Sequence, residues 1–200
     1  MPTTPDADDR APEGPETPQT PLSPEPSGSE SEPRWAGSDF QDPPRTEGGV
    51  ALCGACRIRG ACQLGVEQES LDESGSAHFV LACPKEYEGG PNVAHGGWTA
   101  AVFDDCIGHL PLLHGVRSVT AELTVSFVKP VPVGRELEVR VWIDRREGRR
   151  WYLSGEMVLS STRAVLGRAT GIWVTRDNTH FTRHEQWLAQ QDASADTVLP

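Results

Sequence analysis

The stretch Asn92-Val-Ala-His-Gly-Gly-Trp-Thr-Ala-Ala-Val-Phe-Asp-Asp-Cys-Ile-Gly108 decides the fold and carries most of the functional information in the chain. His95 precedes a pair of glycines, and Asp104 and Asp105 interrupt the apolar run that follows. Glycines let the backbone turn tightly and let a ligand approach the main chain. A helix beginning here would point unpaired N–H groups and a partial positive charge at an anion or a developing oxyanion. With a carboxylate two turns along the same helix, these are the parts that hydrolysis of an acyl bond requires.

This segment resembles the hotdog-fold acyl-CoA thioesterases, specifically their PaaI-type (phenylacetate-pathway) branch. That branch carries His-Gly-Gly near the start of its central helix and a catalytic carboxylate nine residues after the His, a step that leads here from His95 to Asp104. Downstream, Thr120-Ala-Glu-Leu-Thr-Val-Ser-Phe-Val-Lys-Pro-Val-Pro-Val-Gly134 is similar to the family's second strand. The resemblance covers roughly residues 77–176. It implies hydrolysis of an acyl-CoA to free acid and CoA, in a homodimer or homotetramer with active sites between subunits.

Composition divides the chain into three regions. Residues 1–48 hold 11 of the 17 prolines and 11 acidic against 3 basic residues, so we expect a disordered acidic tail. Residues 49–76 form a cysteine-containing extension, and residues 77–200 form one hotdog domain with a short C-terminal helix.

The charge balance excludes several classes of partner. The net charge of −11 offers no positive field to neutralise the phosphates of nucleic acid. No apolar run reaches the ~18 residues of a membrane span, and the acidic N-terminus is unlike a secretory signal. We therefore expect a cytoplasmic protein whose thiols stay reduced. The run Arg145-Arg-Glu-Gly-Arg-Arg150 is read either as a solvated hairpin turn or as a grip on substrate phosphates.

Hydrophobic periodicity predicts an α+β fold. A helix is expected over residues 96–110, apolar nearly all round and therefore buried, with Pro111 and Gly115 ending it. Strands are expected over 78–87, 117–129, 135–146, 150–161 and 164–176, a polar loop or helix over 66–76, and a short helix over 182–190 with Trp187 and Leu188 as contacts. The specific hotdog arrangement, an antiparallel sheet of five to six strands wrapped around one helix, is implied by the resemblance.

The resemblance assigns catalytic roles to three residues. It selects Asp104 over Asp105, since consecutive helix residues point about 100° apart and only one can face the pocket. Asp104 is expected to act as general base on water or as nucleophile, and the sequence does not choose between them. The Gly97 amide, with that of Trp98 as a second candidate, is the expected oxyanion donor. His95 either orients the loop or donates a hydrogen bond to the thioester carbonyl.

Substrate-binding residues are expected on both sides of this segment. Asn92, Gly96 and Trp98 flank the helix start, and Lys129 ends a strand just before a proline. Trp98 near the helix start favours aromatic or medium-chain acyl groups. No cofactor is expected for catalysis.

Four cysteines form a second distinctive pattern. Cys53, Cys56, Cys62 and Cys83 begin with a Cys-x-x-Cys spacing that is typical of zinc ligands. A structural zinc is one reading; a redox-linked pair and inert apolar thiols are the others.

Two further functions remain open at this point. A hotdog enoyl-CoA hydratase or dehydratase would need a different order of acid and His, or a His paired with a helix Glu. A non-catalytic acyl-CoA-binding protein would keep the fold and use the tail and the cysteines to recruit a partner.

Overall fold

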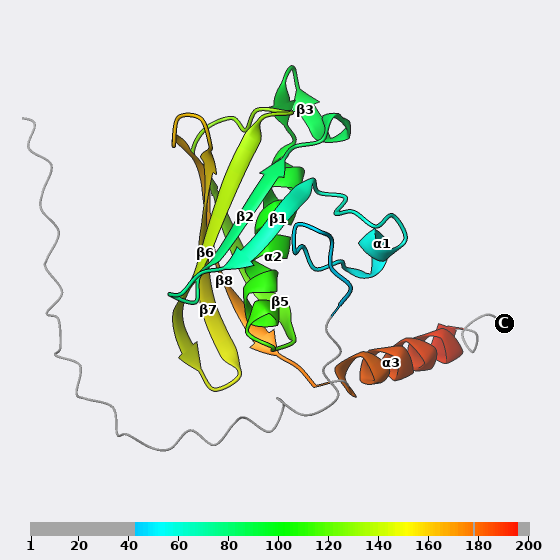
Figure 1. Cartoon of the computed structure of the whole chain (residues 1–200). Coiled ribbons are helices and arrows are strands. Elements are labelled where there is room, and N and C mark those ends of the chain that lie inside the picture. Colours follow the sequence, from blue (N-terminus) through cyan, green and yellow to red (C-terminus); the bar gives the residue numbers. More distant parts are fainter. Residues whose placement is uncertain (1–42, 178, 196–200) are drawn as a thin grey trace, which may run out of the picture. The chain divides into compact units, whose positions relative to one another are not determined.

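The computed structural model describes residues 43–177 and 179–195 (Figure 1). In chain order the elements are α1 (Gly54–Arg57), β1 (Val66–Leu71), β2 (Ala77–Ala82), the 3-10 helix η1 (Lys85–Tyr87), β3 (Glu88–Gly90), β4 (Val93–Ala94), α2 (Gly96–Leu113), β5 (Ser118–Phe127), β6 (Glu136–Glu147), β7 (Arg150–Leu159), β8 (Val165–Thr175) and α3 (Thr179–Ala195).

Six strands form one antiparallel sheet in the order β1-β2-β6-β7-β8-β5. The strands β5, β6, β7 and β8 confirm the predictions over 117–129, 135–146, 150–161 and 164–176. Alternating Val, Leu, Ile and Trp residues made these strands predictable. Gly148, at φ +56°, lets β6 turn tightly into β7. β3 and β4 form a separate two-stranded hairpin just before α2.

Helix α2 runs along one face of the sheet (Figure 1) and forms the centre of the core. Its buried side chains include Val102, Phe103, Ile107 and Leu110. The sheet approaches it closely at Gly155, where a Cβ atom would lie 3.3 Å from the side chain of Ile107. The expected α+β architecture, one antiparallel sheet around one central helix, is confirmed.

Two element boundaries differ from the prediction. Pro111 lies inside α2 rather than ending it, because a proline in the last turn removes only one late hydrogen bond. The helix ends instead where Gly115 adopts φ +74°. The strand predicted over 78–87 stops at Ala82 as β2, and residues 85–87 form η1 instead.

The polar segment 66–76 was expected to be a loop or a helix, and this was wrong. Residues 66–71 form the edge strand β1, which pairs with β2. A register shift between Val66 and Gln68 places the buried positions Val66 and Glu69 three residues apart, so the two-residue period is lost.

Residues preceding β1 pack against the domain. Of the expected tail 1–48, residues 1–42 lie outside the described residues, whereas residues 43–48 contact β1 through the Glu69 N–H, which donates to the Gly48 carbonyl (2.9 Å). In the extension that follows, the Leu52 N–H donates to the Pro44 carbonyl (2.9 Å).

The Arg145–Arg150 run forms the β6–β7 turn, as the solvated-hairpin reading predicts. The Arg145 guanidinium lies over the ring of Tyr152 at 3.4 Å, and that of Arg146 over Trp151 at 3.7 Å.

Helix α3 is longer than the predicted 182–190, and Trp187 and Leu188 are exposed on it rather than packed. Among the described helices, including α3 and α2, none combines the length and apolar character that crossing a bilayer requires.

Candidate active site

His95 caps the start of α2. Its backbone is extended, and its Nδ1 accepts a hydrogen bond from the Gly97 N–H at 2.9 Å. A neutral imidazole that accepts at Nδ1 carries its proton on Nε2, so the second ring nitrogen is a donor. His95, Gly96 and Gly97 are exposed. The amide expected to stabilise an oxyanion is thus present at an exposed helix start, with His95 as its acceptor.

The β3–β4 hairpin holds His95 in this position. The His95 N–H donates to the Tyr87 carbonyl at 2.7 Å, just before β3. At Gly89, a Cβ atom would lie 2.7 Å from the Cα of His95, so only glycine fits. The backbone of the hairpin therefore fixes the loop that leads into α2.

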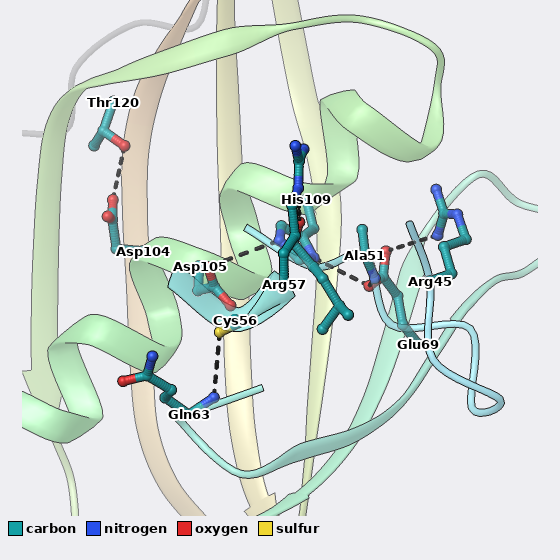
Figure 2. A network of polar contacts seen from close by, with 11 residues as sticks. Arg45, Ala51, Cys56, Arg57, Gln63, Glu69, Asp104, Asp105, His109 and Thr120 are labelled. Atoms are coloured by element: carbon teal, nitrogen blue, oxygen red, sulfur yellow. Dashed lines mark hydrogen bonds and ion pairs between the residues drawn. The ribbon is translucent and has the colours of Figure 1, made fainter. Parts of the chain in front are cut away.

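Asp104 lies two turns further along α2, on its exposed side. Its Oδ1 accepts a hydrogen bond from the Thr120 hydroxyl at 2.7 Å (Figure 2). Thr120 belongs to β5, the edge strand at one end of the sheet. Thr120 begins the strand motif quoted above, but no local pattern indicates that it contacts a helix carboxylate sixteen residues away.

Within one chain, Asp104 and Gly97 are far apart for a shared reaction. Seven helical residues at 1.5 Å each separate their backbones by about 10 Å along the axis. A single chain therefore does not bring the carboxylate and the α2 start to one carbonyl carbon.

Asp105 points to a different neighbourhood from Asp104 (Figure 2). Its Oδ1 lies 3.7 Å from Nε2 of His109, one turn along α2. Burial raises the pKa of Asp105, while the charge of His109 acts in the opposite direction. Asp104 and Asp105 thus have different partners, as expected for consecutive residues of a helix.

His109 links Asp105 to a buried glutamate on β1. Its Nδ1 lies 3.0 Å from Oε2 of Glu69, whose side chain is fully buried and also accepts the Ala51 N–H at 2.8 Å. Burial disfavours the charged imidazole, but the hydrogen bond with Glu69 and the charge of Asp105 outweigh it and raise the pKa of His109. No local sequence pattern indicates this contact between Glu69 and His109, because forty residues separate them.

A hollow of about 340 Å³ lies beside the start of α2. It brings together two of the expected substrate-binding residues, Gly96 and Lys129, with the exposed aromatic ring of Phe127. Trp98 is instead buried, and its indole N–H donates to the Leu64 carbonyl at 3.2 Å, so its position is that of a core residue. Asn92 is in the preceding turn, where φ is +60° and its N–H donates to the Glu88 carboxylate.

A second hollow, of about 350 Å³, lies at the other end of α2. Residues of the extension, of α2 and of β5 surround it, together with Arg176, which follows β8.

The four cysteines expected to bind zinc do not form a metal site among residues 43–177 and 179–195, where no cluster of three or more His, Cys, Asp or Glu side chains could hold an ion. Cys56 accepts the Gln63 N–H through its sulfur (3.3 Å), and burial raises the pKa of its thiol to about 11. Burial likewise raises the pKa of Cys83 to about 11. The structural zinc therefore stays a prediction that the arrangement of these side chains does not support.

The segment that carries these features matches a known protein family. Residues 91–165, which include the α2 start, Asp104 and Thr120, match the family model of the Thioesterase superfamily. This segment is thus similar to the thioesterase superfamily.

Two mammalian acyl-coenzyme A thioesterases resemble the chain in sequence. The acyl-coenzyme A thioesterase THEM4 of Bos taurus is 29% identical over 90 residues, which are 45% of this chain and 37% of the bovine protein. The acyl-coenzyme A thioesterase THEM5 of Homo sapiens is 28% identical over 128 residues, 60% of this chain and 51% of the human protein. The aligned region thus spans about half or less of each relative.

A solved structure of a bacterial protein has the same fold. The E. coli PaaI protein from the phenylacetic acid degradation operon superposes with a TM-score of 0.53 at 17% identity, over 61% of this chain and 84% of that one.

Proposed function

We propose that the protein hydrolyses acyl-CoA thioesters to a free acid and CoA, with Asp104 as the catalytic carboxylate. The observation that carries this proposal is the exposed Asp104 on the central helix, held by Thr120 at 2.7 Å inside the segment that matches the Thioesterase superfamily. Both mammalian relatives are named acyl-coenzyme A thioesterases, which supports the substrate class.

Asp104 acts on the thioester carbonyl carbon directly or through a water molecule. As a general base it takes a proton from water, and the hydroxide equivalent adds to the carbonyl before CoA thiolate leaves. As a nucleophile it adds to the carbonyl and displaces CoA thiolate, forming a mixed anhydride that water then hydrolyses to the free acid and the Asp104 carboxylate. In either course the Thr120 hydroxyl orients the carboxylate, because it donates to Oδ1 and leaves Oδ2 for the reaction.

The oxyanion donors come from a second copy of the chain in this proposal. One chain separates Asp104 from the start of α2 by about 10 Å. β5 is a ten-residue edge strand, and exposed edge strands favour pairing with another strand. Two-fold pairing along β5 would place each Asp104, held by Thr120 on that strand, at the junction between the copies. A dimer thus completes two equivalent sites.

His95 and Gly97 share the task of stabilising the oxyanion. The Gly97 N–H donates to His95 Nδ1 without substrate, and the Nε2 proton of His95 points away from that bond. We infer that His95 donates through Nε2, or turns aside so that the Gly97 N–H reaches the carbonyl oxygen. Loss of one oxyanion donor typically lowers kcat by about 10²–10³-fold.

Release of free CoA thiol from a panel of acyl-CoAs, followed with a thiol reagent, tests the proposal. Asp104→Asn should lower kcat by about 10³-fold or more, because it keeps the shape but removes the base or nucleophile. Asp105→Asn is the matched control, since its neighbour His109 lies away from Asp104, and it should retain most of the turnover.

An unchanged rate in Asp104→Asn would remove that residue from the mechanism. Tight acyl-CoA binding by the wild-type protein without thiol release would instead identify a non-catalytic binder. Hydration of an enoyl-CoA without thiol release would identify a hydratase.

A further inference from the structure

We propose that the hollow at the C-terminal end of α2 binds the terminal carboxylate of a short dicarboxylic acyl group, so that the preferred substrates are ω-carboxyacyl-CoAs. This inference rests on the proposed function, because it assigns the acyl group of the same thioester. The hollow has a volume of about 350 Å³, near the lower end of the range for ligand pockets, which suits a short chain.

The hollow begins one helical turn beyond the proposed catalytic carboxylate. Gly108, which lines it, follows Asp104 by four residues and therefore lies on the same face of α2. Ser118, also in the lining, precedes Thr120 by two residues on β5. The two side chains therefore lie on the same face of the strand, and Thr120 is the residue that bonds Asp104. An acyl chain whose carbonyl lies at Asp104 can therefore extend along both elements into the hollow.

The lining is positively charged. Arg57, Arg117 and Arg176 contribute to it, and no Asp or Glu does. Arg176 Nε is buried, and within residues 43–177 and 179–195 it has no hydrogen-bond partner. Buried polar groups without partners are costly, so an unpaired guanidinium nitrogen beside a hollow indicates an anionic ligand.

Ser118 gives an independent indication of a polar ligand. Its hydroxyl is buried and, in the part of the chain that the structure describes, it has no hydrogen-bond partner either. A hydroxyl and a guanidinium facing one hollow match the acceptor oxygens of a carboxylate, which forms strong charge-assisted bonds with arginine.

Most of the remaining wall is apolar. Leu52, Leu112, Val116 and Val119 line it, and they would contact the methylene groups between the two carboxyl ends. A hydrated nucleotide phosphate fits such a wall poorly. The extension supplies one side of the hollow through Leu52 and Arg57, and this extension lies outside the segment that matches the superfamily. The selectivity is therefore assigned in part to residues outside the segment that matches the superfamily.

A matched pair of substrates tests the inference. Glutaryl-CoA and pentanoyl-CoA have acyl chains of equal length and differ in the terminal carboxylate. For the full-length wild-type protein, we expect kcat/KM to be at least about tenfold higher for glutaryl-CoA, the value of one charge-assisted hydrogen bond. Equal values, or a preference for pentanoyl-CoA, would overturn the proposal.

Variants locate the preference. Arg176→Met should bring the ratio of the two kcat/KM values close to one, and Arg176→Lys should keep part of it because the charge remains. Arg168→Met is the matched control, since Arg168 pairs with Glu156 outside the hollow and should leave the ratio unchanged. Ser118→Ala and Arg57→Met test the same wall if Arg176→Met unfolds, as judged by thermal melting. If Arg176→Met weakens both substrates equally, the arginines bind the phosphates of CoA and the inference is wrong.

Binding separates this inference from the proposed function. Calorimetry on Asp104→Asn measures the dissociation constants of the two acyl-CoAs without hydrolysis. A tenfold preference for glutaryl-CoA there supports the hollow even when the wild-type protein releases no thiol, an outcome that would refute the thioesterase proposal alone. No preference in binding would overturn the inference alone.

Discussion

Thr120 is the residue that orients Asp104, since its hydroxyl donates the 2.7 Å bond to the carboxylate. Thr120→Val keeps the shape of the side chain and removes the donor. We expect kcat to fall about tenfold, the value of one hydrogen bond to a charged group, with little change in KM. Thr120→Ser retains the hydroxyl and should restore most of the rate. Steady-state kinetics on the three proteins measure this, and equal kcat values would exclude an orienting role.

Glu69 stabilises the charged form of His109 in the buried network. Because the folded pKa of His109 is raised above its unfolded value, this contribution is fully present below about pH 6.5 and is lost as pH rises through the folded pKa. Glu69→Gln should therefore cost about 1.5–3 kcal/mol of unfolding free energy at pH 5.5 and less at pH 8.5. Urea unfolding at both pH values measures the difference. A cost that grows with pH would contradict the assignment.

At the scale of elements, α2 and the sheet approach so closely that side-chain size is limited at their contact. Gly155→Ala would place a methyl group 3.3 Å from Ile107 and should destabilise the protein by about 1–3 kcal/mol. Ile107→Val removes Cδ1, one of the two Ile107 carbons at 3.3 Å, so the double variant should lose less unfolding free energy than the two single variants lose together. Denaturant unfolding of all four proteins gives the coupling; strict additivity would show that the sheet yields at Gly155 instead.

The elements also show what the sequence can reveal. The strands β5 to β8 were predictable because alternating apolar residues and a Gly148 turn are local signals. β1 was not, because its register shift hides the period and one of its two buried positions is Glu69, a residue type that normally predicts exposure. The placement of Asp104 and His95 on one helix was readable from spacing, whereas the Thr120 bond depends on tertiary contact alone.

For the whole molecule, the proposal requires that one active site contain residues from two chains. Asp104 and Thr120 would come from one copy, and His95 with Gly97 from the other, since a single chain separates the two groups by about 10 Å. His95→Asn keeps a good helix cap but removes the imidazole donor, so this variant and Asp104→Asn should each have little activity as homodimers.

Mixed dimers then decide the arrangement. Co-expressed Asp104→Asn and His95→Asn chains carrying different tags can be purified as heterodimers through both tags. Each heterodimer has one site with both changes and one with neither, so we expect about half the wild-type turnover. A heterodimer of Asp104→Asn with Thr120→Val is the control, because both changes affect the same half of the site. Its turnover should not exceed that of the Thr120→Val homodimer. If neither heterodimer regains turnover, the whole site lies in one chain. Failure to form any dimer would exclude pairing along β5.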